Sequence, residues 1–482
     1  MGQPRLSREA DTWRDDIAEA LAGYSVAEWP ADHTAHLEPA RRLLLDTLAV
    51  GLGAYHHPAA AIARQYLSFF PGSEQGATIW GTGRRAPAPV AALVNGVPLR
   101  CYDYNDVLVG RLSPGHPSDM VAPVLALAET LDCSGRQVLD ALAVGYQVAA
   151  TVYEFAPSEA SGWDHANLSA LGAVAALSRL MRLTTEQATE AMGIVAIQHL
   201  QSNEIESSAP NRRGDLTMWK RFHGADIMRY ALEACLLASK GAEGPVRPFR
   251  GELGFLSIFK VPGDPSAILA RGLRVDMPPM AIGRANMKRW PVGSRAQSAI
   301  QSVLDARRQL PQGARITEVN VRAEQEVYTH LVGIRNDPWH PKSRESADHS
   351  LPYVMGAAAL DGRITVDSFN LERVLDPQRA RFIAECVKIS VDPTLGGADA
   401  ANLAEVELVT ADGLRAKGIA SPAKGHHKHP FNVDDLSEKL HESAAAVLPA
   451  AQLDRLAEHV SGLENSASIR ELAGFLAGDN GL

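Results

Sequence analysis

The sequence contains few cysteines and no long apolar segment. No stretch approaches the roughly 18 to 20 apolar residues that are needed to span a bilayer, and Met1–Trp13 lacks the apolar region of a secretory signal. The four cysteines have none of the paired spacings that build a zinc site, an iron–sulfur site or a disulfide framework; they are Cys101, Cys133, Cys235 and Cys386. These absences predict a reduced, cytoplasmic protein.

Motifs for several common chemistries are also missing. The sequence has no G-x-G-x-x-G turn between a strand and a helix, no Walker A loop, no G-x-S-x-G elbow and no H-E-x-x-H helix. These absences argue against nucleotide-dependent, serine-hydrolase and zinc-protease activities. The formal net charge of −9 gives a surface that repels polyanions, so neither nucleic acid nor a membrane is an expected partner. What remains is proton-transfer chemistry in which cationic side chains bind an anion.

The composition is that of an ordinary globular protein, with 46% hydrophobic and 21% charged residues, and 482 residues favour two domains. From about Ala18 to Arg271, apolar residues recur at three- and four-residue intervals, which predicts helices. Ser134 with Gln137 and Thr184 with Gln187 have the S/T-x-x-Q form that caps a helix start. The clearest helices are predicted at residues 41–55, 120–131, 138–155, 168–180 and 187–196.

The pattern changes after Leu273. Alternating apolar and polar residues predict strands near residues 319–321, 387–391 and 406–408, and Asp412-Gly413 predicts a hairpin turn. Helical patterns lie between these strands, at residues 296–309 and 351–360. We therefore predict a mainly α protein, in which a large all-helical domain carries a smaller inserted α+β lid domain. The predicted divisions are 1–273 for the first part of the helical domain, 274–424 for the lid and 425–482 for C-terminal helices that return to the helical domain.

The densest polar cluster lies between residues 101 and 119. The proline after His116 disfavours helical geometry there, which predicts an imidazole on a rigid loop just before a helix. Ser118 can cap that helix, so its free amides would face the same space. A lone His-Pro pair is more often a surface loop. Asp103 and Asp106 favour catalysis, because acid–base chemistry needs an imidazole whose tautomer and pKa are set by a carboxylate.

Four further clusters hold candidate residues, and each also has a plainer structural interpretation. His165 precedes an apolar helix, where it could be incidental beside an N-cap. Lys220 lies next to aromatic residues, as in many solvated helix turns. Lys288 and Arg289 precede Trp-Pro and could form a basic surface turn. Tyr353 ends the segment DHSLPY, which could equally be a capped helix start with a half-buried tyrosine.

Seven short motifs carry a resemblance that covers nearly the whole chain. They are Leu43–Gly51 (LLLDTLAVG), Ala91–Gly96 (AALVNG), Asp103–Asp106 (DYND), His116–Asp119 (HPSD), Met218–Lys220 (MWK), Lys288–Pro291 (KRWP) and His349–Tyr353 (HSLPY). In this order and at these separations they resemble the MmgE/PrpD family, which includes 2-methylcitrate dehydratase and cis-aconitate decarboxylase. The pair DYND and HPSD is the most specific element.

The resemblance implies a homodimer whose subunits have a large helical domain, a smaller α+β lid and an active site between them. Val107 departs from the family pattern, because a threonine commonly follows the second aspartate. Losing that hydroxyl alters which substrate oxygen the pocket can bind. Carried over position by position, the resemblance implies that the active site is lined by Asp103, His116, His165, Lys220, Lys288 and Tyr353.

We therefore predict a metal-free, cofactor-free lyase of the 2-methylcitrate dehydratase type that eliminates water from a citrate-like polycarboxylic acid. His116 is the leading acid–base group, Asp103 orients it, and His165 or Tyr353 supplies the second proton-transfer group. The residues predicted to bind the substrate are Lys220, Lys288, Arg289, Asp106 and Ser118.

Other functions remain open on the same fold. They are a cis-aconitate-type decarboxylase, an epimerase of an amino-dicarboxylate and a dehydratase specific to another pathway. A catalytically silent binding protein with the family fold is the alternative from another class. The retained aspartate, histidine and lysine clusters argue against that last interpretation.

Overall fold

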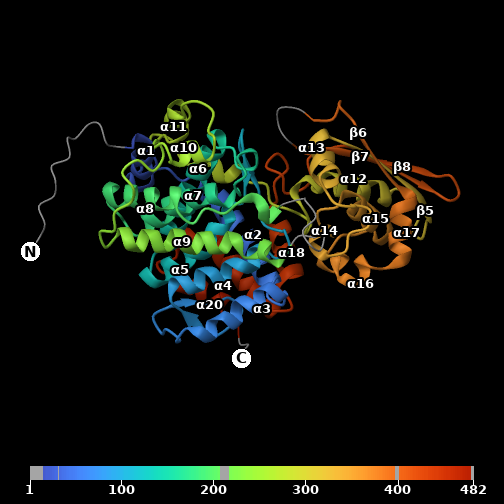
Figure 1. Cartoon of the computed structure of the whole chain (residues 1–482). Coiled ribbons are helices and arrows are strands. Elements are labelled where there is room, and N and C mark those ends of the chain that lie inside the picture. The colour runs from blue at the N-terminus through green and yellow to red at the C-terminus, as the bar shows by residue number, and fades with distance from the viewer. Residues whose placement is uncertain (1–14, 31, 207–216, 397–400, 479–482) are drawn as a thin grey trace, which may run out of the picture.

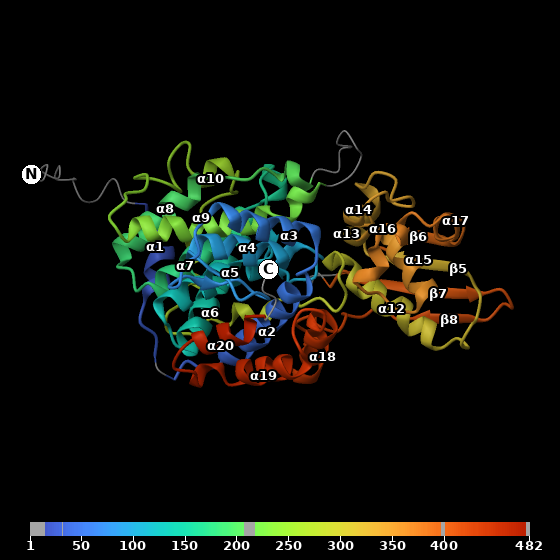
Figure 2. The same ribbon diagram turned by 90° about the horizontal axis from the view of Figure 1, so that it is seen from below.

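The computed structural model describes residues 15–30, 32–206, 217–396 and 401–478. The protein is mainly α-helical, as predicted (Figure 1). Buried apolar residues form one large core from residues 17–285 and 431–476, and a second from residues 290–423. The chain thus leaves the first core, builds the second and returns to the first. Figures 1 and 2 show the helices of the first core on one side and the mixed helices and strands of the second on the other.

Helices build the first core, and their sequence patterns are close to those expected. Both predicted capping boxes are confirmed, at Ser134 with Gln137 and at Thr184 with Gln187. The helices of this core are α1 Asp16–Val26, α2 Leu37–Gly53, α3 Pro58–Gln65, α4 Ala88–Arg100, α5 Val121–Leu131, α6 Gly135–Phe155, α7 Ala166–Leu180, α8 Thr185–Ile197, α9 His223–Ala238, α10 Phe255–Ile258, α11 Ser266–Gly272, α18 Val433–Ala444, α19 Ala450–Ser461 and α20 Arg470–Leu476.

Helices α6 and α7 approach each other closely at two glycines. A Cβ added to Gly145 would lie 2.8 Å from the carbonyl oxygen of Gly172, and one added to Gly172 would lie 2.5 Å from that of Gly145. Only glycine permits this approach without moving the backbone. The contact fixes α7, whose N-terminal cap is His165.

A four-stranded sheet and the helices packed on it build the second core. The strand order is β6-β5-β7-β8, in which β5 pairs parallel to β6 and antiparallel to β7. β7 and β8 form a hairpin whose turn contains Asp412 and Gly413, as predicted. Gly413 has a φ of +85°, which explains the glycine there. The strands are β5 Ile316–Ala323, β6 Val387–Val391, β7 Ala404–Thr410 and β8 Arg415–Gly418.

Both helices predicted in this part of the chain are present, α12 before β5 and α15 between β5 and β6. Each buries an apolar face in the second core. Among the described residues, no helix is both long and apolar enough to cross a bilayer. The helices of this part are α12 Gln297–Arg308, α13 Gln325–Tyr328, α14 Arg344–Ala347, α15 Leu351–Asp361, α16 Leu371–Val374 and α17 Pro377–Cys386.

Short elements carry many of the residues that face the space between the two cores. β3 Leu108–Val109 pairs with β4 Pro114–Gly115, and β1 Ala77–Thr78 pairs with β2 Arg85–Ala86. One π-helical turn is η8 Thr329–Gly333. The 3₁₀ turns are η1 Tyr66–Phe69, η2 Pro117–Met120, η3 Glu159–Ser161, η4 Asn203–Glu206, η5 Met218–Arg221, η6 Met280–Arg284, η7 Ser294–Ala296, η9 Val366–Phe369 and η10 Leu463–Asn465.

Candidate active site

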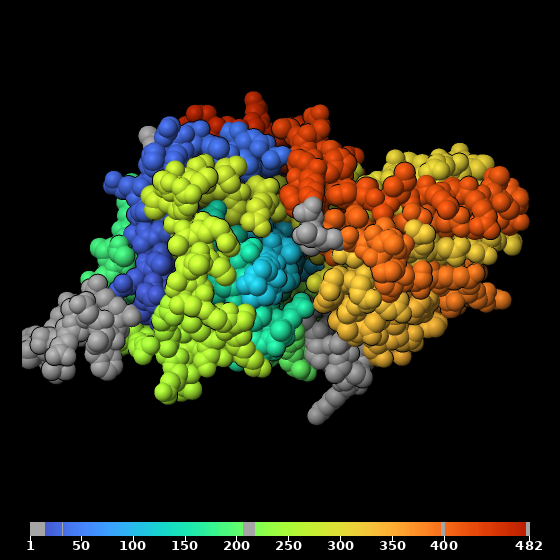
Figure 3. Space-filling model, turned by 90° about the horizontal axis from the view of Figure 1, so that it is seen from above, coloured from blue at the N-terminus to red at the C-terminus, as the bar shows by residue number. Residues whose placement is uncertain are grey.

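A cavity of about 470 Å³ is lined by residues from both cores. In Figure 3, the orange residues of the second core lie beside the blue-to-green residues of the first. Positive groups outnumber negative ones among the described residues that line the cavity, so it suits an anion. The cations are Arg100, Lys220, Arg221, Lys288, Arg295 and Arg335, and the carboxylates are Asp103, Glu159 and Glu204.

Asp103 and Lys288 form a buried ion pair at one side of this cavity. The Nζ of Lys288 donates to Asp103 Oδ1 at 2.9 Å and to the Asp103 carbonyl at 2.8 Å. Asp103 has a φ of 48°, a left-handed conformation that aspartate tolerates better than most residues. The pair joins the loop after α4 to the segment that connects the two cores.

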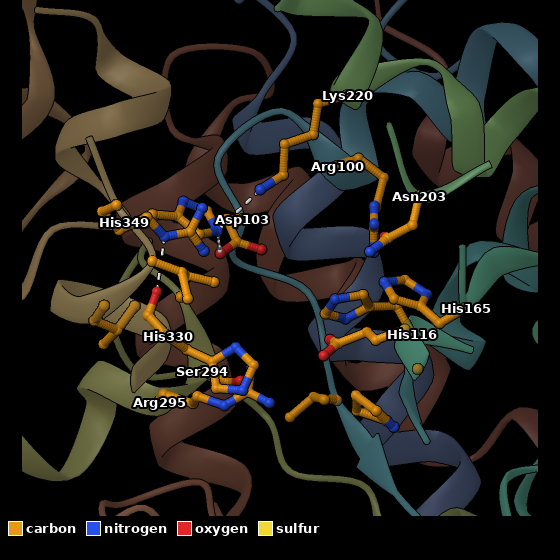
Figure 4. Close-up of a pocket in the computed structure, with 18 of the residues that line it drawn as sticks. Arg100, Asp103, His116, His165, Asn203, Lys220, Ser294, Arg295, His330 and His349 are labelled. Atoms are coloured by element: carbon orange, nitrogen blue, oxygen red, sulfur yellow. Dashed lines mark hydrogen bonds and ion pairs between the residues drawn. The ribbon is translucent and has the colours of Figure 1, made fainter. Parts of the chain in front are cut away.

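Lys220 and His349 complete this side (Figure 4). Lys220 Nζ lies 2.9 Å from His349 Nε2, and Asp103 Oδ2 lies 3.4 Å from the same nitrogen. His349 Nδ1 donates to Asp348 Oδ1, and Asp348 Oδ2 lies 3.3 Å from Nη2 of Arg221. The Lys220 ammonium has no lone pair, so it donates to Nε2 and the imidazole proton lies on Nδ1.

The charges of this group hold it in a defined ionisation state. Burial raises the pKa of Asp103, but the charges of Lys288 and Lys220 outweigh burial and hold the pKa well below its ordinary value. Burial also lowers the pKa of Lys288, although Asp103 opposes this. Burial and the adjacent Lys220 lower the pKa of His349. Asp103 is therefore an anion and His349 a neutral imidazole near pH 7.

His116 faces the cavity from the opposite side (Figure 4). The β3–β4 ribbon brings it back to Asp106, whose backbone carbonyl accepts the Nδ1 proton. In a neutral imidazole this leaves the lone pair on Nε2. Burial and the charges of Arg100 and Lys288 hold the pKa of His116 well below its ordinary value. The imidazole is therefore neutral at pH 7 and can accept a proton.

His165 lines the cavity beside His116, in an edge-to-face contact with ring centroids 5.0 Å apart. Asp164 is fully buried next to it, and its Oδ1 accepts the amide proton of Ala166 at the start of α7. The same Oδ1 lies 3.8 Å from His165 Nδ1 and 3.3 Å from His223 Nε2. His165 thus lies in the cavity wall, where it packs against the His116 ring.

Asp106 and Ser118 lie behind the cavity wall, not in it. Asp106 Oδ2 accepts from the Tyr146 hydroxyl at 2.8 Å, and Oδ1 accepts from the Ser118 amide at 3.3 Å. Burial raises the pKa of Asp106 to about 7. Both side chains are fully buried and neither lines the cavity. The sequence predicted that both side chains contact the substrate. In the structure they support the loop that carries His116.

Arg289 and Tyr353 are not brought to the cavity either. Arg289 points to α18, where its guanidinium lies 3.2 Å from Glu438 and 3.7 Å from Glu442. Tyr353 packs in the second core and donates its hydroxyl to the Ser368 carbonyl at 2.7 Å. Both side chains are therefore occupied with structural contacts away from the other candidates.

Sequence reasoning missed several residues that line the cavity. His349 stands four residues before Tyr353, and its position beside Asp348 was the signal that could have identified it, because a carboxylate fixes an imidazole tautomer. Arg100 lies at the end of α4 and had no distinguishing pattern. The second-core residues lie on η7 and on or directly after the π-helical turn η8, an element found often at functional sites; they are Ser294, Arg295, His330, Leu331, Ile334 and Arg335.

Comparison with known proteins agrees with the sequence motifs. The MmgE/PrpD N-terminal domain model matches residues 15–267, and the MmgE/PrpD C-terminal domain model matches residues 290–465. The chain belongs to the MmgE/PrpD family. It is 28% identical to human cis-aconitate decarboxylase over 457 residues, covering 92% of this chain and 90% of that protein. It is 24% identical to the 2-methylcitrate dehydratase of Escherichia coli K12 over 476 residues, covering 92% of each.

Proposed function

We propose that this protein is a lyase that removes water from a citrate-like polycarboxylic acid. The observation that carries the proposal is the convergence of His116, Asp103, Lys288, Lys220 and His349 on one cavity. A neutral imidazole faces two ammonium groups across this cavity. The family membership supports the same class of reaction, since the relatives include 2-methylcitrate dehydratases and cis-aconitate decarboxylases.

The cationic lining provides the substrate-binding part of the proposal. Lys220 and Lys288 would bind carboxylates of the substrate, and Lys288 would stabilise the charge that develops when a carboxylate becomes enolate-like. Asp103 holds the Lys288 ammonium in place. Arg295 and Arg335 would bind a more distant carboxylate from the second core. An acid with two or three carboxylates matches this distribution of charge.

His116 is the proposed general base. Its Nδ1–H is held by the Asp106 carbonyl, so Nε2 can take the proton on the carbon next to a carboxylate. The carbon–hydrogen bond breaks and its electrons form the new carbon–carbon double bond. His165 would support the ring in the geometry that this transfer requires.

The Lys220 and His349 pair is the proposed general acid. As the carbon–oxygen bond breaks, the departing hydroxide would take a proton from this hydrogen-bonded pair and leave as water. Asp348 and Arg221 maintain the orientation of His349 from behind. The pair thus takes the second proton-transfer role that the sequence had led us to expect for His165 or Tyr353.

Incubation of the purified protein with 2-methylcitrate and with citrate tests the proposal. Dehydration would produce a conjugated alkene, which is followed by its ultraviolet absorbance and identified by mass spectrometry. Tight binding of these acids without turnover would instead indicate a silent binding protein. Inversion of an amino-dicarboxylate without loss of water would indicate an epimerase.

Decarboxylation of cis-aconitate is the second candidate, favoured by the 28% identity to the human decarboxylase. Here a carboxylate leaves as carbon dioxide, and the cationic lining would stabilise the negative charge left on the substrate. The Lys220 and His349 pair would then donate the proton that replaces the lost group. Release of carbon dioxide from cis-aconitate, with no loss of water from citrate, would select this reaction.

The proposal includes the organisation of the protein. We propose that residues 274–424 act as an inserted lid over the helical domain, that the protein is a cytoplasmic homodimer, and that it needs no metal. Among the described residues, no group of three histidine, cysteine, aspartate or glutamate side chains could hold a metal ion. Light scattering tests the dimer, and activity after dialysis against a chelator tests the metal requirement.

A further inference from the structure

Lys439 and Asp46 form a second buried ion pair behind the candidate active site. Lys439 lies on α18 and Asp46 on α2, and Lys439 Nζ donates to Asp46 Oδ1 at 2.6 Å. Both side chains have no solvent-exposed surface. Neither residue lines the cavity. Two ends of the chain, 393 residues apart, thus meet in a charged contact inside the first core.

The Lys439 ammonium also reaches the two segments that carry the Asp103–Lys288 pair. Its Nζ lies 2.9 Å from the backbone carbonyl oxygen of Lys288 and 3.4 Å from that of Tyr104. It also lies 3.8 Å from the centre of the Tyr104 ring, a distance typical of a cation–π contact. An ammonium has three protons, and here each has one acceptor.

The two segments are tied to each other by further hydrogen bonds. Tyr104 donates its hydroxyl to the Arg289 carbonyl at 2.8 Å, and Lys288 Nζ donates to the Asp103 carbonyl. Residues 103–104 and 288–289 therefore form one cross-linked unit. Lys439 connects the backbone of this unit to helices α2 and α18.

Stability alone is a poor explanation for such a pair. Removing two opposite charges from water costs free energy that their attraction often fails to recover, and apolar residues of similar size commonly serve as well. Burial raises the pKa of Asp46 and lowers that of Lys439. Both shifts favour the uncharged form, because charged groups lose free energy of hydration when they are buried. The pair is costly to bury, and it is hydrogen-bonded to the backbone beside the site. These two features suit a role in aligning the residues of the site.

We propose that Asp46 and Lys439 are positioning residues for the reaction. By holding the carbonyls of Tyr104 and Lys288, they fix the Asp103 carboxylate and the Lys288 ammonium relative to the substrate. This inference rests on the proposed function, because it assigns the pair to the same site. Its mechanism is indirect, since Lys439 acts only through the backbone of residues that face the cavity.

The double variant Asp46→Leu/Lys439→Met tests this inference. It replaces both charges with apolar side chains of similar size, so the melting temperature should stay near that of the wild type. The carbonyls of Tyr104 and Lys288 then lose their anchor. We expect kcat/KM to fall about tenfold to a hundredfold, because small misplacements of catalytic groups have effects of this size. The acid limb of its pH profile should also move to higher pH, because the charge of a correctly placed Lys288 helps to hold the pKa of His116 low.

Leu440→Ala is the matched control. Leu440 is the next residue on α18, is fully buried and does not line the cavity. The melting temperature of this variant should be lower than that of the wild type. Its kcat/KM should stay within twofold of the wild-type value, and the acid limb of its pH profile should not shift. A double variant that behaves like Leu440→Ala would overturn the inference. If the double variant does not fold, Lys439→Gln serves in its place. The glutamine amide has two protons, so it can donate to only two of the three acceptors of the Lys439 ammonium.

A crystal structure of the folded variant separates this inference from the proposed function. We expect the cross-linked unit to shift as a whole, so that the 3.4 Å contact between Asp103 Oδ2 and His349 Nε2 is lost or lengthened. An unchanged contact would contradict positioning even if activity fell. A wild-type protein that turns over none of the candidate acids would contradict the proposed function. The crystal structure of the variant would still show whether Asp46 and Lys439 position Asp103 and Lys288.

Discussion

Lys220 Nζ lies 2.9 Å from Nε2 of His349, although the two residues are 129 positions apart in the chain. Lys220 is carried by η5 of the first core, and His349 precedes α15 of the second. Their contact fixes the imidazole tautomer, since Nε2 must accept a hydrogen bond from Lys220 while Nδ1 donates one to Asp348. The relationship also means that the proposed general acid is assembled only when the two cores meet.

Replacing His349 and Tyr353 separately tests which of them has a catalytic role. His349→Gln should lower kcat by about 10² to 10⁴, the range for a lost acid–base group. Tyr353→Phe should leave kcat within a few-fold and cost about 1 kcal/mol of folding free energy, because only the hydrogen bond to Ser368 is lost. Steady-state kinetics and urea unfolding measure both. Equal losses of kcat in the two variants would contradict the assignment.

His116→Ala should lower kcat by about 10² to 10⁴ with little change in melting temperature, because the proposed base is removed. Asp106→Asn is the comparison. His116 uses the backbone carbonyl of Asp106, which this substitution retains, so kcat should fall less than tenfold. Near wild-type turnover by His116→Ala would remove this residue from the mechanism.

Lys288 and Arg289 are adjacent in sequence but point to different surroundings. Lys288→Met should raise KM and lower kcat/KM by tenfold or more, because the variant lacks the ammonium that binds a carboxylate. Arg289→Ala should leave both constants within about twofold, because its partners are the exposed Glu438 and Glu442. Initial rates over a range of substrate concentrations distinguish the two. A similar rise in KM for both would contradict the proposed substrate contact.

The pH dependence of kcat/KM should reflect the lowered pKa values of the two imidazoles. His116 and His349 must be neutral in the proposed roles, and both pKa values lie below the ordinary histidine value of about 6.5. Activity should therefore persist at pH 6 and be lost only at lower pH. The basic limb should lie below the ordinary lysine value of about 10.4, because the pKa of Lys288 is lowered. An acid limb above pH 6.5 would contradict these assignments.

His57 should make stability depend on pH independently of catalysis. Burial and the nearby Arg221 lower the pKa of His57 to about 3, so between pH 6.5 and pH 3 the unfolded state binds the extra proton. Stability therefore falls as the pH falls through this window, by about 2 kcal/mol between pH 7 and pH 5. His57→Asn keeps an acceptor for the Ala59 amide and should remove this loss. Urea unfolding at both pH values measures it.

The control for this last prediction is the neighbouring residue His56, which is exposed. His56→Asn should retain the pH dependence of the wild type. If the free energy of unfolding falls between pH 7 and pH 5 by the same amount in both variants and in the wild type, the loss does not arise from burial of His57.

Local patterns predicted the elements of the fold well, because capping residues, apolar periodicity and the Asp412-Gly413 turn act over a few residues. They also identified five of the residues that line the cavity, since Asp103, His116, His165, Lys220 and Lys288 lie in recognisable motifs. The direction of each side chain was beyond such patterns. Lys288 and Arg289 differ by one position, and only the packing of α18 determines which of them faces the cavity.

The residues missed by sequence reasoning share a physical origin. Arg295, His330 and Arg335 enter the cavity because the second core is placed against the first, and this placement depends on contacts far apart in the sequence. Tyr353 was expected to face the site because the family resemblance implied it. The intervening turn of α15 instead directs the tyrosine into the second core.

Because residues of both cores line the cavity, an acid bound there would bridge the two cores in addition to the direct contacts between them. Ligand that binds only the native arrangement stabilises it by mass action, by about 2.7 kcal/mol at a hundred times its dissociation constant. Cellular supply of such an acid would then govern how long the enzyme survives proteolysis, and a cell that runs short of the metabolite would clear the protein faster.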